Sequence, residues 1–250
     1  MIGVIGAFLV VIIANVLEGG SPMSLILFAP MLLVFGATLL ICLAGGTMGD
    51  AKLSFRALVK GFTSPAPSAA QLVPELVTLA DKARREGLLA LEDYVSDLED
   101  PFLIKALTMA IDGTDPEELR DILEAEVHAK KAETKQAAKF WNSAGGYAPT
   151  IGIVGTVMGL VHVLEQLAEP EKLGHLIAGA FVATLWGVMS ANVLFLPLGA
   201  RITRLGELQA KQMEIVIEGI AALQAGSNPR VVQQRLESLL PADQREPEAA

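Results

Sequence analysis

The sequence has little of what enzymes and metal sites are built from. It contains a single cysteine, Cys42, so no disulfide framework and no cysteine-based metal site can form within one chain. Its three histidines, His128, His162 and His175, are widely scattered, so a histidine metal site would need several subunits. Phosphate-binding glycine loops, dinucleotide fingerprints and metalloprotease helices are missing. The net charge of −9 gives no reason to expect nucleic-acid binding. We therefore expect no metal site, no cofactor and no conventional active site.

Charged residues are also scarce, at 19% of the chain, whereas hydrophobic residues make up 52%. Four stretches contain no Asp, Glu, Lys or Arg, namely residues 1–17, 21–49, 147–164 and 176–200. A helix needs about 20 mostly apolar residues to cross a hydrocarbon core of roughly 30 Å. Strand signals are absent. The sequence therefore predicts an all-α polytopic membrane protein with four transmembrane helices in two hairpins and a helical cytoplasmic domain.

The first apolar stretch resembles a signal peptide only in its position. It has no basic residues at its start, and no small-residue cleavage pattern follows it. Residues 18–22 instead lead directly into a second apolar stretch. A hairpin of two spans explains this pattern better than a cleaved leader.

The positions of the cations predict the topology. Of the 19 Lys and Arg residues, twelve lie between Lys52 and Lys139 and six follow residue 200, whereas Lys172 alone lies between the last two apolar stretches. Loops rich in Lys and Arg remain on the cytoplasmic side of a membrane. We expect both termini in the cytoplasm and both hairpin tips on the outer side of the membrane.

Four regions follow from these boundaries. We predict a transmembrane hairpin at residues 1–49, a cytoplasmic helical domain at 50–145, a second hairpin at 146–202, and cytoplasmic helices with a tail at 203–250. The proline-rich stretch at residues 65–68 is the clearest break, and the sequence at 112–116 indicates that one helix stops and another starts.

Directly after the second apolar stretch, Lys52, Arg56 and Lys60 recur every four residues, and apolar side chains fill the positions between them. This pattern predicts a short amphipathic helix along the inner headgroups. A solvated linker with incidental charges is the alternative.

Small residues distinguish the second hairpin from the first. Gly152, Gly155 and Gly159 punctuate its first span, and Gly179, Ala183, Gly187 and Ala191 recur every four residues in its second span. Small residues on one helix face let backbones approach closely in lipid. We expect Gly155, Gly159, Gly179, Ala183 and Gly187 to pack tightly against other helices.

Polar side chains in this hairpin are few and neutral. Pro149 and Thr156 are two helical turns apart in one span, and Thr184 and Pro197 lie in the other. Each threonine hydroxyl can bond a carbonyl of its own helix. Alternatively, the threonines and prolines of the two spans can together line a narrow polar path. The spans contain no titratable relay group, so any ion passing here needs a carboxylate from a partner.

The same residues resemble a known family, the MotA-type flagellar stator proteins. The resemblance covers nearly the whole chain in order. The third span of the family is similar to residues 147–164 (YAPTIGIVGTVMGLVHVL), the fourth span to residues 179–187 (GAFVATLWG) with Asn192 and Pro197, the segment that meets the rotor to residues 82–92 (KARREGLLALE), and the tail to residues 219–229 with Leu236.

The resemblance implies a ring of five copies around two copies of a MotB-type partner, whose membrane helix carries an ion-binding aspartate. The ring would lie in the bacterial inner membrane. Ion flow would turn it, and the cytoplasmic loop would drive the rotor protein FliG. Arg84 and Glu92 match the rotor-contact positions of the family. Pro149 and Pro197 match prolines tied to the ion-driven conformational cycle, and Thr156 and Thr184 match polar positions by the ion path. The ion is H⁺ or Na⁺, and the threonine at position 156 slightly favours Na⁺.

Three alternatives remain at this point. An ExbB- or TolQ-type subunit, which energises outer-membrane processes, has similar third and fourth spans but only three spans and an external N-terminus. A passive membrane scaffold would use the small-residue faces equally well. An intramembrane enzyme fits least, because the spans contain no nucleophile–base or carboxylate pair.

Overall fold

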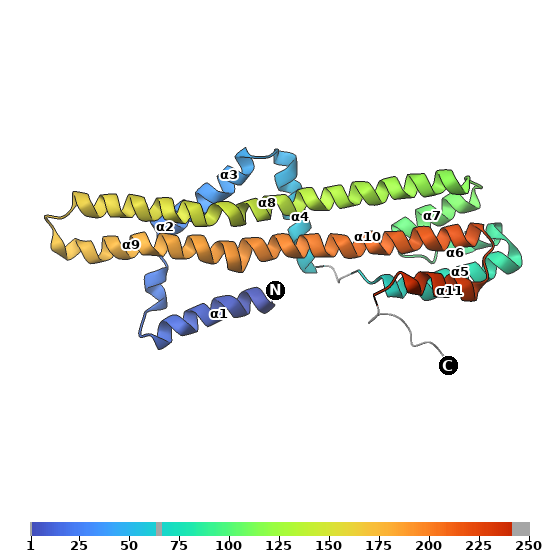
Figure 1. Cartoon of the computed structure of the whole chain (residues 1–250), viewed down its shortest axis with the longest axis horizontal. Coiled ribbons are helices and arrows are strands. Elements are labelled where there is room, and N and C mark those ends of the chain that lie inside the picture. The colour runs from blue at the N-terminus through green and yellow to red at the C-terminus, as the bar shows by residue number, and fades with distance from the viewer. Residues whose placement is uncertain (1, 64–66, 242–250) are drawn as a thin grey trace. The chain divides into compact units, whose positions relative to one another are not determined.

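The computed structural model describes residues 2–63 and 67–241, and every regular element in that part of the chain is a helix (Figure 1). This confirms the all-α prediction. The chain divides into two units, with unit 1 comprising Met1–Ser64 and Thr134–Thr203, and unit 2 comprising Pro65–Glu133 and Arg204–Ala250.

Two long helices contribute residues to both units. They are α8 (Pro116–Glu165), which continues through Pro149, and α10 (Leu196–Gln224). The predicted domain boundaries lie within these helices, at residues 145–146 and 202–203. The remaining elements of unit 1 are α1 (Ile2–Leu17), the 3-10 turn η1 (Pro22–Leu25), α2 (Phe28–Met31), the π-helical segment η2 (Leu32–Ala37), α3 (Thr38–Ala44), α4 (Met48–Thr63), α9 (Pro170–Met189) and the π-helical segment η5 (Ser190–Phe195).

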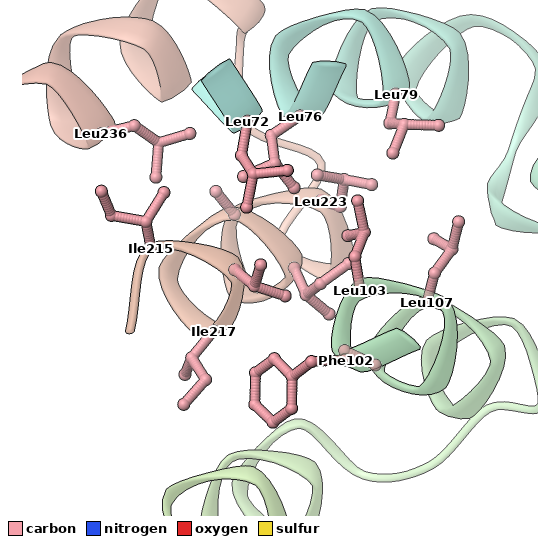
Figure 2. Close-up of a cluster of buried hydrophobic side chains, with 14 of the residues drawn as sticks. Leu72, Leu76, Leu79, Phe102, Leu103, Leu107, Ile215, Ile217, Leu223 and Leu236 are labelled. Atoms are coloured by element: carbon pink, nitrogen blue, oxygen red, sulfur yellow. The ribbon is translucent and has the colours of Figure 1, made fainter. Parts of the chain in front are cut away.

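Unit 2 is built around a core of large aliphatic side chains (Figure 2). Its remaining elements are the 3-10 turn η3 (Ala69–Gln71), α5 (Leu72–Glu86), the 3-10 turn η4 (Leu88–Leu91), α6 (Glu92–Val95), α7 (Pro101–Ile111) and α11 (Pro229–Ser238). Leu76 of α5, Leu103 of α7 and Ile215 of α10 are fully buried in this core. Burying side chains of this size stabilises a fold by about 1.5–3 kcal/mol each.

The helix boundaries of unit 2 follow the local sequence. The Asp115 carboxylate accepts hydrogen bonds from the backbone N–H of Glu117 at 2.9 Å and of Glu118 at 3.3 Å, and Pro116 is the first residue of α8. Asp100 caps α7 in the same way. An acidic N-cap followed by proline starts a helix because it satisfies free N–H groups and fixes φ. The predicted stop and start at residues 112–116 is confirmed.

Membrane spans can be judged by length and apolarity alone. In the part of the chain that the structure describes, two helical stretches are long and apolar enough to cross a membrane, Pro116–Glu165 and Pro170–Gln224. The apolar helices of the first hairpin, Gly3–Leu17 and Phe28–Ala44, are shorter. The structure therefore contains two candidate spans by this criterion, where the sequence predicted four.

Candidate functional site

The candidate site lies in unit 1, where the second half of α8 packs against α9. The two helices run side by side and are joined by a short connection at residues 166–169 (Figure 1). Residues three and four apart share a helix face, so Gly152, Gly155 and Gly159 all point to the same side of α8. The sequence thus gives α8 a smooth face without side chains.

Backbone meets backbone at the centre of this contact. A Cβ atom on Gly152 would lie only 2.9 Å from the Ala183 carbonyl oxygen, and one on Gly187 would lie 2.7 Å from the Ala148 carbonyl oxygen. Cβ atoms essentially never come within 3.0 Å of other heavy atoms. Both positions therefore require glycine for the observed approach.

The remaining contacts continue along the same face. A Cβ atom on Gly155 would lie 2.7 Å from the Cβ of Ala183, and one on Gly159 would lie 2.6 Å from the Cβ of Ala180. Small residues on both helices therefore set the separation of α8 and α9, as they do in helix pairs that associate in lipid.

Gly179 lies outside this contact. A Cβ atom there would meet Leu27 Cδ1 at 3.9 Å, which is an ordinary van der Waals distance. Of the five small residues predicted to pack tightly, Gly155, Gly159, Ala183 and Gly187 form the α8–α9 contact, and Gly179 makes no close approach.

Two threonine hydroxyls meet inside the contact. The Oγ1 atoms of Thr156 and Thr184 are hydrogen-bonded to each other. Thr156 Oγ1 also lies 2.9 Å from the Ala180 carbonyl oxygen and 3.2 Å from the Gly152 carbonyl oxygen, which belongs to its own helix. Thr184 Oγ1 lies 3.4 Å from the same Gly152 oxygen. The structure therefore brings the two predicted ion-path residues together across the helix contact.

The threonine pair has more oxygen lone pairs than protons. Each hydroxyl supplies one O–H donor and two acceptor lone pairs. One proton joins the two hydroxyls, and the other goes to a backbone carbonyl, so lone pairs remain that no protein donor fills. Hard cations take oxygen ligands, and both threonines are half-buried rather than sealed off. The pair can act as a neutral oxygen ligand.

The site has no carboxylate, lysine or arginine of its own. Residues 147–164 and 176–200 contain no Asp, Glu, Lys or Arg. Within residues 2–63 and 67–241, no group of three or more His, Cys, Asp and Glu side chains could hold a metal ion. A threonine hydroxyl does not ionise near neutral pH, so the threonines can bind and orient an ion but cannot relay protons by titration.

Both predicted coupling prolines interrupt the helix ladder near the site. Pro149 lies inside α8, two turns before Thr156. Pro197 lies at the second position of α10, directly after the π-helical segment η5. Proline has no N–H, so the carbonyl four residues earlier loses its α-helical donor. The helices that carry Pro149 and Pro197 therefore have weakened backbone bonding toward the same end of the contact, where Gly145 of α8 lies against Leu196 of α10.

The π-helical segments were not expected from the sequence. η5 spans Ser190–Phe195, and a second one, η2, spans Leu32–Ala37 in the first hairpin. Phe35 of η2 and Phe195 of η5 make an edge-to-face contact, with their ring centroids 6.2 Å apart. Trp186 of α9 donates a hydrogen bond from Nε1 to the Leu25 carbonyl oxygen at 2.7 Å. A proline near each segment, Pro30 and Pro197, was the available signal, because single π-turns arise where the helical ladder is disturbed.

The predicted rotor-contact residues lie in unit 2. Arg84 is in the last turn of α5 and Glu92 begins α6, and both side chains are exposed. The turn between them depends on Gly87, whose φ of 86° favours glycine. Lys82 Nζ lies 3.8 Å from the ring centroid of Tyr94, which ties α5 to α6. The segment thus presents separate positive and negative side chains on an anchored turn.

Comparisons with known proteins agree with this arrangement. Residues 95–215 match the model of the "MotA/TolQ/ExbB proton channel family". Motility protein A of Bacillus subtilis is 37% identical over 98% of this chain and 91% of its own length. Chemotaxis protein PomA of Vibrio alginolyticus is 30% identical over 96% of this chain and 94% of its own length.

Solved structures resemble the whole chain. The flagellar MotAB stator complex from Bacillus subtilis matches with a TM-score of 0.88 and 36% identity, covering 97% of this chain and 96% of that one. The C. jejuni MotAB structure matches with a TM-score of 0.93 and 29% identity, covering 100% of this chain and 97% of that one. The chain therefore belongs to the MotA/TolQ/ExbB proton channel family and, within it, to the group that contains motility protein A and PomA.

Proposed function

We propose that this chain is the membrane-ring subunit of an ion-driven flagellar stator, which converts ion flow across the bacterial inner membrane into torque on the rotor. The observation that carries the proposal is the pair of neutral hydroxyls, Thr156 and Thr184, held together by the glycine-lined contact of α8 and α9. The sequence similarity to motility protein A and PomA along nearly the whole chain supports the same function. The chain is not an enzyme.

The proposal includes four membrane spans, with both termini in the cytoplasm. In the isolated chain, α1 of the first hairpin exposes large apolar side chains, such as Val10, Ile13 and Leu17. The outer face of α8 exposes Ile153, Val157 and Val161. Such surfaces are costly in water and suit lipid or a neighbouring span. Lipid and further helices would cover them, and the short α1 would reach the interface through Glu18 and Gly19.

The ion path needs a second protein. The spans contain no carboxylate, so a MotB-type partner would supply an intramembrane aspartate beside the threonine pair. The solved MotAB complexes resemble this chain and contain such a pair of proteins by name. Five copies of this chain would surround two copies of the partner. The permeating ion is H⁺ or Na⁺, and the hydroxyl lone pairs that no protein donor fills slightly favour Na⁺.

Torque would leave the chain through the segment of residues 82–92, which would contact FliG. Arg84 and Glu92 are exposed and form no ion pair in the described residues, so their charges are available to a partner. Arg84→Glu should lower swimming speed while the protein still accumulates in the membrane. Arg230→Glu, on the exposed start of α11, is the control and should leave swimming speed unchanged. Normal swimming of both variants would remove Arg84 from the rotor contact.

Pro149 and Pro197 would act as the flexible points of the cycle. Both lie where an α-helical hydrogen bond is missing, so the backbone near the threonine pair can change its winding at low cost. Ion binding to the partner's aspartate would be transmitted to α8 and α10 through these positions.

Removing one hydroxyl of the pair tests the function. Thr184→Val keeps the size of the side chain and deletes the oxygen, and Thr184→Ser keeps the oxygen. We expect ion flux through the complex with its partner to fall about tenfold in the valine variant, the effect of one ligand worth roughly 1–1.5 kcal/mol, and to persist in the serine variant. Unchanged flux in Thr184→Val would contradict the proposal. Swimming speed against external sodium, with a proton uncoupler as control, identifies the ion.

An ExbB- or TolQ-type subunit is the alternative function, because the matching family model includes those proteins. It predicts three spans with an external N-terminus. A reporter fused before Gly3 that locates the N-terminus outside the cell would favour it, and a cytoplasmic reporter signal would support the stator.

A further inference from the structure

Helix α4 is fixed to unit 1 by one face. Ala51, Ser54 and Gly61 are buried on this face. Trp141 Nε1 donates a hydrogen bond to the Ser54 carbonyl oxygen at 3.3 Å, and Arg201 Nε donates one to the Gly61 carbonyl oxygen at 2.9 Å. Thr47 and Asp50 cap the start of the helix. The Asp50 carboxylate accepts hydrogen bonds from the backbone N–H and the hydroxyl of Thr47, and the Thr47 hydroxyl oxygen accepts one from the backbone N–H of Asp50. α4 is thus an anchored helix and not a loose linker.

The opposite face of α4 combines cations with large apolar side chains. Lys52, Arg56 and Lys60 are exposed and recur every four residues. Between them, Phe55 is 46% exposed and Val59 is 60% exposed. These five residues share a single helix face, since the cations recur every four residues and each apolar residue follows a cation by three. We call this set the α4 face.

The charges of the α4 face are not neutralised within the described chain. Lys52, Arg56 and Lys60 form no ion pair with any carboxylate of residues 2–63 and 67–241. The only acidic residue of α4, Asp50, is held by Thr47. By contrast, Lys131 in unit 2 pairs with Glu214 at 2.7 Å. An anchored helix that leaves three cations unpaired beside exposed apolar side chains has a surface suited to an anionic, amphipathic partner.

We infer that the α4 face binds anionic phospholipid headgroups at the inner surface of the membrane. Phosphates would neutralise the three cations, while Phe55 and Val59 would enter the acyl boundary, as in other interfacial amphipathic helices. A small soluble anion would satisfy the cations but leave both apolar side chains in water. The inference rests on the membrane placement proposed above and adds a lipid requirement to it.

Trp141 provides a reporter for this surface. Its ring centroid lies 5.1 Å from that of Phe55, and the only other tryptophan of the chain is Trp186. The full chain with Trp186→Phe is reconstituted in phosphatidylcholine vesicles that contain dibrominated phosphatidylglycerol or, in parallel, dibrominated phosphatidylcholine at the same fraction. Bromine quenches nearby tryptophan fluorescence, so the two quenching curves give the relative affinity for the two lipids.

The Trp186→Phe chain should prefer phosphatidylglycerol about fivefold or more, since each Lys or Arg near an anionic surface contributes about a fivefold preference. The preference should fall to about one in Lys52→Gln/Arg56→Gln/Lys60→Gln. The matched control Lys105→Gln/Lys130→Gln/Arg230→Gln removes three cations from unit 2 and should keep it. High salt should weaken the preference because it screens exposed charges.

Equal quenching by both lipids in the Trp186→Phe chain overturns the inference, and crosslinking between copies through Phe55→Cys would then identify a second copy as the occupant. A control triple variant that loses the preference as fully as the α4 variant also overturns it, because net charge alone would then explain the binding. The quenching needs no ion flux, so a chain that fails the flux test and still prefers phosphatidylglycerol contradicts only the stator function. No quenching by either lipid contradicts the membrane placement itself.

Discussion

In unit 1, α8 and α9 meet through glycine and alanine, whereas the helices of unit 2 meet mainly through larger aliphatic residues such as leucine and isoleucine. A Cβ on Gly187 would lie 2.7 Å from the Ala148 carbonyl oxygen of the facing helix. In unit 2 the helices are separated by large aliphatic side chains, such as those of Leu103 and Ile215, which are fully buried (Figure 2). The first kind of contact brings backbones together, and the second fills the space between them.

The polar contacts differ as well: unit 2 contains charged pairs, whereas the α8–α9 contact of unit 1 contains neutral hydroxyls. In unit 2, Arg120 donates to Glu218 at 2.7 Å, and the Glu218 carboxylate raises the pKa of Arg120. In the α8–α9 contact of unit 1, the polar partners are the hydroxyls of Thr156 and Thr184 and backbone carbonyls. Apolar burial drives folding in water, but lipid is as apolar as leucine, so helices there associate by close packing and neutral hydrogen bonds. The contrast agrees with the proposed placement of unit 1 in lipid and of unit 2 in water.

The largest effect should follow from emptying the core of unit 2. Leu103→Ala removes a fully buried side chain of α7 and leaves a cavity, so we expect a loss of about 2–5 kcal/mol. Leu89→Ala is the control, because that leucine is 74% exposed. Hydrogen exchange of the α7 and α10 amides in the full chain measures the free energy of opening. A loss below about 1 kcal/mol for Leu103→Ala would mean that unit 2 does not depend on its aliphatic core.

A smaller effect separates the two kinds of glycine. Gly187 of unit 1 and Gly219 of unit 2 would each place a new Cβ 2.7 Å from another atom. The neighbours of Gly187 are the backbone atoms of Ala148 and Gly152, whereas the neighbour of Gly219 is the flexible end of Leu76. Gly187→Ala should therefore destabilise the α8–α9 contact by about 1–3 kcal/mol, and Gly219→Ala by less.

Thermal unfolding of the purified complex measures the Gly187→Ala change, and Gly179→Ala in the same helix provides its control, because a Cβ there has room. Hydrogen exchange measures the Gly219→Ala change. Equal costs at Gly187 and Gly219 would break the distinction between backbone contacts in unit 1 and side-chain contacts in unit 2.

Much of the fold could be predicted from residue types alone. The absence of charge in residues 147–164 and 176–200, together with the glycine spacing, predicted two packed apolar helices, and the acid–proline sequence at Asp115 predicted the start of α8. The continuity of α8 could not be predicted, because Pro149 ordinarily ends or bends a helix and the flanking segments differ in polarity. The π-helical winding of η5 has no periodic pattern that distinguishes it from α-helix.

The site was predicted in its members but not in its contacts. Thr156 and Thr184 share no sequence motif, and their meeting depends on the rotation of α8 against α9, which is fixed by the glycines between them. Gly179 follows the same four-residue spacing as Ala183 and Gly187 yet makes no close approach. Spacing identifies a helix face, but only the neighbouring helix determines which part of that face is covered.

The smallest effect should come from a carboxylate in unit 2. Partial burial raises the pKa of Glu75 above its ordinary value of 4.5, and the nearby carboxylates of Asp100 and Glu99 raise it further. An acid whose pKa is raised on folding costs stability when it is ionised. That cost is absent below pH 4.5, where the group is protonated in both states, and appears as the pH rises through the raised folded pKa.

Glu75→Gln should therefore stabilise unit 2 at pH 7, in contrast to the two substitutions above, and the gain should vanish as the pH falls below 4.5. We expect less than about 0.5 kcal/mol, because solvent screens this half-buried group. Hydrogen exchange of α5 in the variant and the wild type at pH 7 and pH 4 measures the difference. Added salt should reduce the part that arises from Asp100 and Glu99. A variant that is less stable than the wild type at pH 7 would mean that the Glu75 carboxylate has a favourable partner, so that unit 2 uses even its crowded acids in attractive pairs.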